Sequence, residues 1–172
     1  KEKRMSQIIL ASQSPRRKEL LEQIGLEFEI CPAKGEEIIT KSVPEEVVME
    51  LSKQKAEEVA AMVSSYGEAH KDITTPSDIL VIGADTVVAY NGEILGKPTD
   101  EADAKRMLTM LSGNTHSVFT GVTLVLIDKS GRAGELVFYE KTDVKMYEMS
   151  EAEIDRYIAT GEPMDKAGSY GI

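Results

Sequence analysis

Two adjacent arginines stand where a helix is expected to begin. Ser14 and Pro15 favour a helix start, because serine is a good N-cap and proline suits the first helical position. Arg16 and Arg17 then fall in the first turn, where the helix dipole disfavours cations. An anion held by free backbone N–H groups, the serine hydroxyl and the guanidiniums would explain this placement. A solvated basic turn, with Ser14 merely capping the helix, is the alternative.

A lysine interrupts the apolar stripe of a second expected helix, residues 44–63. Apolar residues recur at spacings of three or four from Val48 to Met62, and Lys55 occupies a position where this stripe calls for an apolar side chain. A lysine at the edge of a core commonly extends its ammonium to water, and the pattern alone favours that interpretation. The other interpretation directs the ammonium into a cleft, towards phosphate.

A carboxylate follows the most hydrophobic expected strand, residues 79–82. We expect Asp85, with Thr86 after it, at the carboxyl end of this strand, where ligands of α/β proteins collect. A carboxylate there can bind a metal ion or act as a base, whereas the alternative is a turn aspartate bonded to its own backbone. Lys97 adds a cation in a loop, and a solvated lysine is the simpler interpretation of that residue alone.

Several familiar motifs are missing from the sequence. It contains neither a G-x-x-x-x-G-K-[ST] loop nor a G-x-G-x-x-G fingerprint. His70 and His116 lack the spacing of zinc ligands, so we expect them to have surface or core roles. Cys31 has no partner that marks a nucleophile and is expected to be a small buried residue.

The elements that must position these residues alternate between strands and helices. Strands are expected at 7–12, 26–31, 79–82, 86–90, 116–127 and 135–147, and helices from Pro15 to Gly25 and at 44–63, 101–111 and 151–160. Residues 64–78 are expected to form a loop. The pair Asn91-Gly92 indicates a hairpin, and Ser150 with Glu153 forms a capping box before the last helix. This order, with hairpins among the alternating elements, predicts an α/β fold with a mixed sheet.

Size and charge limit the class of protein. A chain of 172 residues suits one domain, or two small lobes that share a cleft. Its net charge of −10 would repel a nucleic-acid backbone, so we expect no nucleic-acid partner, whereas a small polyanion needs only a local group of cations. No apolar run approaches the roughly 20 residues of a membrane helix. We therefore expect no membrane association, and the single cysteine favours a cytoplasmic location.

Motifs along nearly the whole chain resemble those of the Maf nucleotide pyrophosphatases. The resemblance begins with Ala11-Ser-Gln-Ser-Pro-Arg-Arg-Lys-Glu-Leu-Leu21 and continues through Glu36-Glu37, Lys53-Gln-Lys-Ala56, Gly83-Ala-Asp-Thr-Val-Val88, Leu95-Gly-Lys-Pro98, Leu111-Ser-Gly-Asn-Thr-His-Ser-Val118 and Gly161-Glu-Pro-Met-Asp-Lys-Ala-Gly-Ser-Tyr-Gly-Ile172. Seven motifs in the expected order make this resemblance specific. Ala84-Asp-Thr86 and the last motif are similar to those of the branch that cleaves dTTP and UTP.

The resemblance implies a fold, a reaction and a set of site residues. The fold would be a mixed sheet with flanking helices and a central cleft, related to the inosine-triphosphate pyrophosphatases. The reaction would be hydrolysis between the α- and β-phosphates of a nucleoside triphosphate with Mg²⁺ or Mn²⁺, which clears nucleotide pools. The resemblance implies catalytic roles for Asp85, Lys55 and Glu37, metal binding by Glu37 and Asp85, and substrate binding by Ser14, Arg16, Arg17, Thr86 and Lys97, with Arg16 and Thr86 at positions linked to base choice.

Two other classes of function are weighed against this enzyme. A non-catalytic nucleotide-binding regulator linked to septum formation would bind without turnover, and a partner-binding α/β protein would use its cations at an interface. A homodimer is compatible with the sequence, although nothing in the sequence establishes one. Family members usually continue past the last motif with a glutamine, a glycine-rich turn and further elements. We therefore expect residues 1–172 to be one domain that lacks the usual C-terminal tail.

Overall fold

The computed structural model describes residues 7–69 and 78–171, with side chains for all of these except residues 66–69. Its strands are β1 (Gln7–Leu10), β2 (Glu29–Ile30), β3 (Ile79–Tyr90), β4 (Glu93–Leu95), β5 (Thr115–Asp128) and β6 (Gly131–Lys145). Its helices are α1 (Pro15–Gln23), α2 (Pro44–Ala69), α3 (Glu101–Leu111) and α4 (Glu151–Ile158), followed by the 3₁₀ turns η1 (Glu162–Asp165) and η2 (Ala167–Ser169). No helix in these described ranges combines the length and hydropathy required to cross a membrane.

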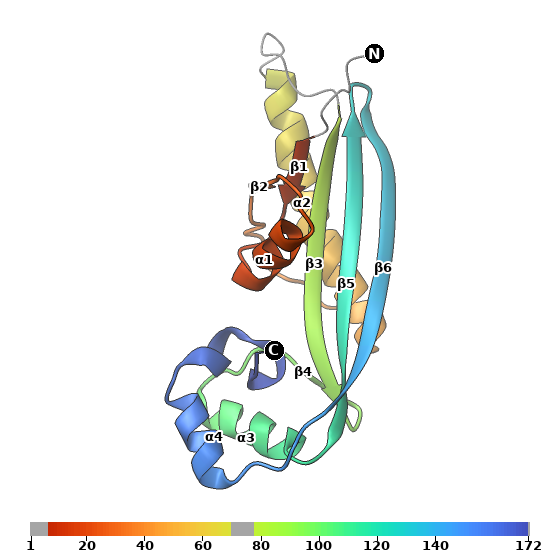
Figure 1. Ribbon diagram of the computed structural model, residues 1–172. Coiled ribbons are helices and arrows are strands. Elements are labelled where there is room, and N and C mark those ends of the chain that lie inside the picture. The colour runs from red at the N-terminus through yellow and green to blue at the C-terminus, as the bar shows by residue number, and fades with distance from the viewer. Residues whose placement is uncertain (1–6, 70–77, 172) are drawn as a thin grey trace. The chain divides into compact units, whose positions relative to one another are not determined.

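The strands form one mixed sheet in the order β2-β1-β3-β5-β6, with β4 paired to β3. The long strands β3, β5 and β6 lie side by side (Figure 1). β1 pairs in parallel with both β2 and β3, whereas β3 and β4 are antiparallel. Asn91 and Gly92 join these last two strands with φ angles of 48° and 78°, the backbone that a tight hairpin turn requires. The predicted α/β fold with a mixed sheet and flanking helices is confirmed.

The chain divides into two compact units. Unit 1 contains Lys1–Ser42, Glu46–Asp85 and Gly121–Tyr139, and unit 2 contains Val43–Glu45, Thr86–Thr120 and Glu140–Ile172. The boundary crosses β3 between Asp85 and Thr86. In unit 1, β1, β3, β5 and α2 share an apolar core that includes Ile9, Val81, Val59 and Val125. In unit 2, α3 packs against α4 through a second apolar cluster.

Helix α2 approaches the sheet closely because two glycines replace side chains on the strands beneath it. A Cβ atom on Gly83 would lie 2.3 Å from the Ser52 carbonyl oxygen, and one on Gly121 would lie 2.2 Å from that of Val48. The buried hydroxyls of Ser52 and Thr123 are hydrogen-bonded at 2.9 Å across the same interface. These contacts determine the register of α2 along β3 and β5.

Four predicted boundaries were wrong. The strand predicted at 79–82 continues through Asp85 to Tyr90, because Gly83 fits against α2 within the strand. The loop predicted at 64–78 is helical up to Ala69, while its part at residues 70–77 lies outside the described residues. β2 has only two residues, against six predicted, and β6 begins at Gly131 rather than at residue 135.

Candidate active site

The register of α2 on β3 brings Lys55 opposite Asp85. Ser52 lies against Gly83, Lys55 follows Ser52 by three residues, and Asp85 follows Gly83 by two. Residues three apart share a helix face, and residues two apart share a sheet face. The two side chains therefore extend into the same space, and the close packing at Gly83 is what aligns them.

Lys55 carries its ammonium to two carboxylates instead of to bulk water. Its Nζ donates a hydrogen bond to Asp85 Oδ1, and it lies 2.9 Å from Glu37 Oε1. The side chains of Lys55 and Asp85 are 19% and 13% exposed, whereas that of Glu37 is 52% exposed. The cluster is thus buried at Lys55 and Asp85 and open at Glu37, which is the side from which a ligand can approach.

Arg17 adds a second cation from the first turn of α1. Its Nη1 donates to Ser12 Oγ at 3.1 Å, and the backbone N–H of Ser14 donates to the same hydroxyl oxygen at 3.2 Å. Ser12 is itself buried. This serine was not among the predicted site residues, although it lies inside the first motif, and its hydroxyl ties the arginine to the turn before the helix.

Burial and charge act against each other in this cluster. Burial raises the pKa of Asp85 above its ordinary value, and the nearby Lys55 and Arg17 cations only partly offset this effect. Burial likewise lowers the pKa of Arg17, against the attraction of the Asp85 and Glu37 carboxylates. A carboxyl group with a raised pKa holds a proton more strongly than an ordinary aspartate, which is a property of a general base.

The remaining predicted residues lie in different settings. Ser14 is at the N-cap of α1, but its side chain makes no capping hydrogen bond. The Arg16 guanidinium is 56% exposed and lies 3.6 Å from the Glu19 carboxylate. Thr86 and Lys97 belong to unit 2, where the Thr86 hydroxyl bonds to that of Thr120 at 3.0 Å and Lys97 is exposed. The structure thus brings together Arg17, Glu37, Lys55 and Asp85 within unit 1.

The carboxylates of the cluster fit an oxygen-ligated divalent cation. Glu37 and Asp85 converge on one ammonium, so their oxygens can also reach a shared cation. The described residues contain no group of three or more His, Cys, Asp or Glu side chains placed to hold a metal ion. Mg²⁺ is commonly bound by one or two carboxylates together with substrate phosphates, and two carboxylates without histidine or cysteine match that preference.

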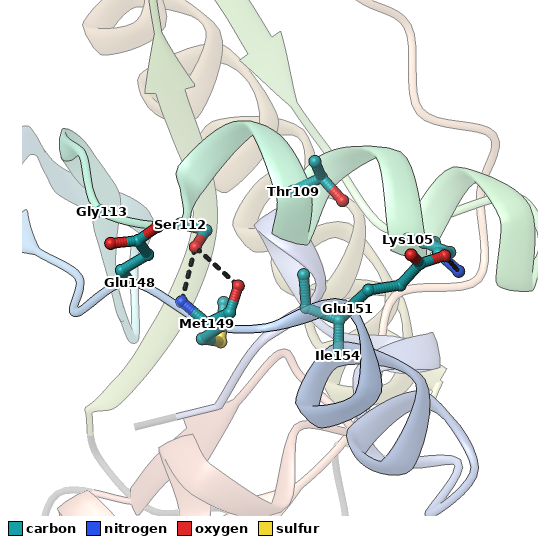
Figure 2. Close-up of a pocket in the computed structure, with 8 residues that line it drawn as sticks. All are labelled: Lys105, Thr109, Ser112, Gly113, Glu148, Met149, Glu151 and Ile154. Atoms are coloured by element: carbon teal, nitrogen blue, oxygen red, sulfur yellow. Dashed lines mark hydrogen bonds and ion pairs between the residues drawn. The ribbon is translucent and has the colours of Figure 1, made fainter.

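A separate hollow in unit 2 contains none of the predicted site residues. This pocket of about 690 Å³ lies between the second half of α3 and the start of α4 (Figure 2). Lys105 at its rim is already paired with Glu151 at 2.7 Å and with Asp155 at 2.8 Å. The Ser112 hydroxyl accepts a hydrogen bond from the Met149 N–H at 2.7 Å. Lys105 and Ser112 thus hold α3 to α4 and to the segment before it, and we assign the candidate active site to the cluster in unit 1.

The fold and the cluster define an α/β protein with a site chemically suited to a metal-bound phosphate anhydride. Comparison with known proteins identifies the family: a family model described as Maf-like protein matches residues 7–172, and the chain belongs to this family. The resemblance found in the sequence motifs is therefore confirmed.

Named relatives agree with this assignment. Over 168 residues, which are 98% of this chain and 82% of the relative, the chain is 74% identical to a dTTP/UTP pyrophosphatase of Agathobacter rectalis. It is 46% identical over 168 residues to a dTTP/UTP pyrophosphatase of Lachnoclostridium phytofermentans, covering 98% of this chain and 79% of that protein. Among solved structures, a HAM1 protein from Coxiella burnetii is 18% identical with a TM-score of 0.44, covering 82% of this chain and 73% of that one.

Proposed function

We propose that this chain hydrolyses dTTP and UTP to the nucleoside monophosphate and pyrophosphate. The observation that carries the proposal is the pairing of Lys55 with both Asp85 and Glu37 beside Arg17, in a chain 74% identical to a dTTP/UTP pyrophosphatase. A binding protein has no need for a buried carboxylate whose pKa is raised, whereas a hydrolase needs a base of this kind.

In the proposed reaction, Asp85 removes a proton from the attacking water. The water oxygen forms a bond to the α-phosphorus as the bond from that phosphorus to the bridging oxygen breaks, and pyrophosphate leaves with the electron pair. Asp85 is suited to this role because burial raises its pKa, while Lys55 holds one carboxylate oxygen in place. Protonation of Asp85 then frees Lys55 to interact with phosphate oxygens.

The cations of the chain neutralise a substrate that carries several negative charges. Arg17 is half-buried, its guanidinium is held by Ser12, and it interacts electrostatically with Asp85 and Glu37. We propose that it binds phosphate oxygens without first needing to be ordered. We propose that Ser14 and Lys97 also contact the triphosphate. The Arg16 side chain is exposed, and with Thr86 we assign it to base choice.

We further propose that Glu37 and Asp85 hold Mg²⁺ or Mn²⁺ together with substrate phosphate oxygens. A bound divalent cation would supply charge neutralisation on the phosphates and lower the pKa of a bound water. Within the chain, the exposed position of Glu37 allows its carboxylate to leave Lys55 and turn towards the incoming metal–nucleotide complex.

A panel of nucleoside triphosphates tests this proposal. The protein is incubated with dTTP, UTP, dCTP, dATP and dGTP in Mg²⁺, in Mn²⁺ and in chelator, and the products are separated by ion exchange. We expect monophosphate and pyrophosphate from dTTP and UTP, with turnover abolished by the chelator. Orthophosphate as the first product, or equal rates for all five nucleotides, would contradict the proposal.

A further inference from the structure

The segment that carries Glu37 is anchored by apolar packing only at its start. Residues 31–43 connect β2 to α2 without a regular helix or strand. Cys31 and Ala33 at its start pack against the core of unit 1, whereas residues 34–40 are all exposed, including Ile38 at 62% and Ile39 at 57%. Glu37 nevertheless reaches Lys55 Nζ at 2.9 Å. Within residues 34–40, polar contacts rather than apolar burial must therefore hold the backbone that carries this carboxylate.

Polar side chains at every fourth position of α2 bind the backbone of this segment. The Glu58 carboxylate accepts from the Lys34 N–H at 2.8 Å and from the Gly35 N–H at 3.0 Å. Gln54 forms a two-way bond with Ile38, accepting from its N–H at 3.0 Å and donating to its carbonyl at 2.6 Å. Glu50 accepts from the Thr40 N–H at 2.9 Å and from its hydroxyl.

These three side chains form one continuous row on the helix. Residues four apart lie on the same face of a helix, about 6 Å apart along its axis. The loop runs antiparallel to the helix, because Glu58 binds its beginning and Glu50 binds its end. We call Glu50, Gln54 and Glu58 the α2 clamp. Glu37 lies between the residues bound by Glu58 and Gln54, and its partner Lys55 lies between Gln54 and Glu58 on the helix.

Local chemistry supports the clamp at both ends. A Cβ on Gly35 would lie 2.7 Å from Glu58 Oε2, so glycine is what lets this backbone approach the carboxylate. At the other end, hydrogen bonds from Thr40 lower the pKa of Glu50 and favour its ionised, accepting form. Each acceptor satisfies backbone N–H groups that a loop without secondary structure would otherwise leave to water.

We propose that Glu50, Gln54 and Glu58 are positioning residues, which hold the 34–40 segment against α2 so that Glu37 is presented to the metal–triphosphate complex. None of the three touches Lys55 or Asp85 in the hydrogen bonds and ion pairs of the described residues. The inference rests on the proposed function, because it assigns to these residues the placement of the proposed metal ligand Glu37.

The test compares Gln54→Ala and Glu58→Ala with the matched control Glu57→Ala. Glu57 is adjacent to Glu58 but pairs with Lys53 and Arg132, away from the 34–40 segment. The first readout is amide hydrogen exchange of the free protein. We expect protected amides at Gly35, Ile38 and Thr40 in the unaltered chain, faster exchange there in the clamp variants, and no change in the control.

The second readout is binding of Mn²⁺ in the presence of the non-hydrolysable α,β-imido analogue of dTTP, measured by calorimetry. Loss of groups that orient a metal ligand commonly weakens metal affinity about 10–100-fold, so we expect at least about tenfold weaker Mn²⁺ binding in Gln54→Ala. Turnover of this variant should recover at saturating Mg²⁺, whereas Glu37→Ala should not recover. Glu58→Gln keeps one acceptor oxygen and should be intermediate between Glu58→Ala and the unaltered chain.

The possible outcomes distinguish failure of the clamp inference from failure of the proposed function. If the unaltered chain cleaves no nucleotide, the proposed function fails, while amide exchange still reports on the clamp. If the unaltered chain is active and the clamp variants match it in amide exchange and Mn²⁺ affinity, the clamp inference is overturned. Equal loss of activity at every Mg²⁺ concentration would also overturn it, because that result indicates general destabilisation.

Discussion

Replacing Asp85 with asparagine separates catalysis from stability in this protein. The substitution keeps the shape of the side chain but removes its charge and its ability to accept a proton. A positioned general base contributes about 10²–10⁴-fold to rate, which corresponds to about 3–5 kcal/mol of activation free energy. We expect kcat for dTTP to fall by this factor, while the analogue of dTTP still binds.

The same substitution should not destabilise the fold at neutral pH. Burial opposes ionisation of Asp85 more strongly than Lys55 and Arg17 favour it, so the pKa of the folded-state carboxyl is raised. The stabilising contribution of such a group is present below its unfolded pKa and is lost as the pH rises through its folded pKa. At neutral pH the ionised carboxyl is therefore a net cost, which asparagine removes, and Lys55 keeps Glu37 as its partner.

The assay pairs single-turnover kinetics with thermal melting. At pH 7.5 we expect the Asp85→Asn variant to melt at or above the temperature of the unaltered chain, and this difference should shrink as the pH is lowered towards about 4. The acid limb of kcat/KM in the unaltered chain should lie above the ordinary aspartate range, since burial raises the pKa of Asp85. Asp155→Asn, at an exposed ion pair in unit 2, is the matched control and should retain turnover. A variant at position 85 that turns over normally would refute the role of Asp85.

Three further predictions concern packing, capping and base choice. Gly83→Ala should lower the free energy of unfolding by about 1–3 kcal/mol or more, because its Cβ would overlap the backbone of α2, whereas Gly134→Ala meets no atom within 4 Å and should not; urea denaturation measures both. Ser150→Ala removes the capping box of α4 and should cost about 1 kcal/mol in the same assay without changing KM, so altered kinetics would contradict a purely structural role. Arg16→Ala should raise KM for dTTP and UTP or even out the preference among bases, and unchanged kinetics with every nucleotide would remove Arg16 from the site.

Local signals in the sequence were sufficient for several elements. Pro15 begins α1, Ser150 and Glu153 form the predicted capping box, and Asn91-Gly92 makes the predicted hairpin turn. Each of these features depends on interactions between residues close in the sequence, so a short stretch of sequence is enough to predict it. Lys55 was also visible as a cation in an apolar stripe, but the pattern alone favoured water as its partner, and the structure places two carboxylates there.

Contacts between distant segments were not visible in that way. The strand predicted at 79–82 stopped before Gly83, but this glycine lies within β3 because α2, about 30 residues earlier in the chain, packs directly on it. Glu50 and Glu58 lie on a polar face of α2, and a polar helix face by itself predicts exposure to solvent. Their backbone partners lie in a loop, and the path of a loop cannot be predicted from hydrophobic periodicity. Ser12 was not predicted because its hydrogen bond with the Arg17 guanidinium depends on the side-chain conformation of Arg17, which the sequence does not reveal.

The central claim is that the cluster around Asp85 cleaves a triphosphate rather than only binding it. The most direct test is a ³¹P NMR time course of dTTP with this chain and Mg²⁺ in ¹⁸O-labelled water. If the cluster catalyses attack of water on the α-phosphorus, the three dTTP resonances disappear together, replaced by equal amounts of pyrophosphate and of dTMP that carries the label. Persistence of dTTP resonances shifted by binding but never converted, or formation of dTDP and orthophosphate, would contradict it.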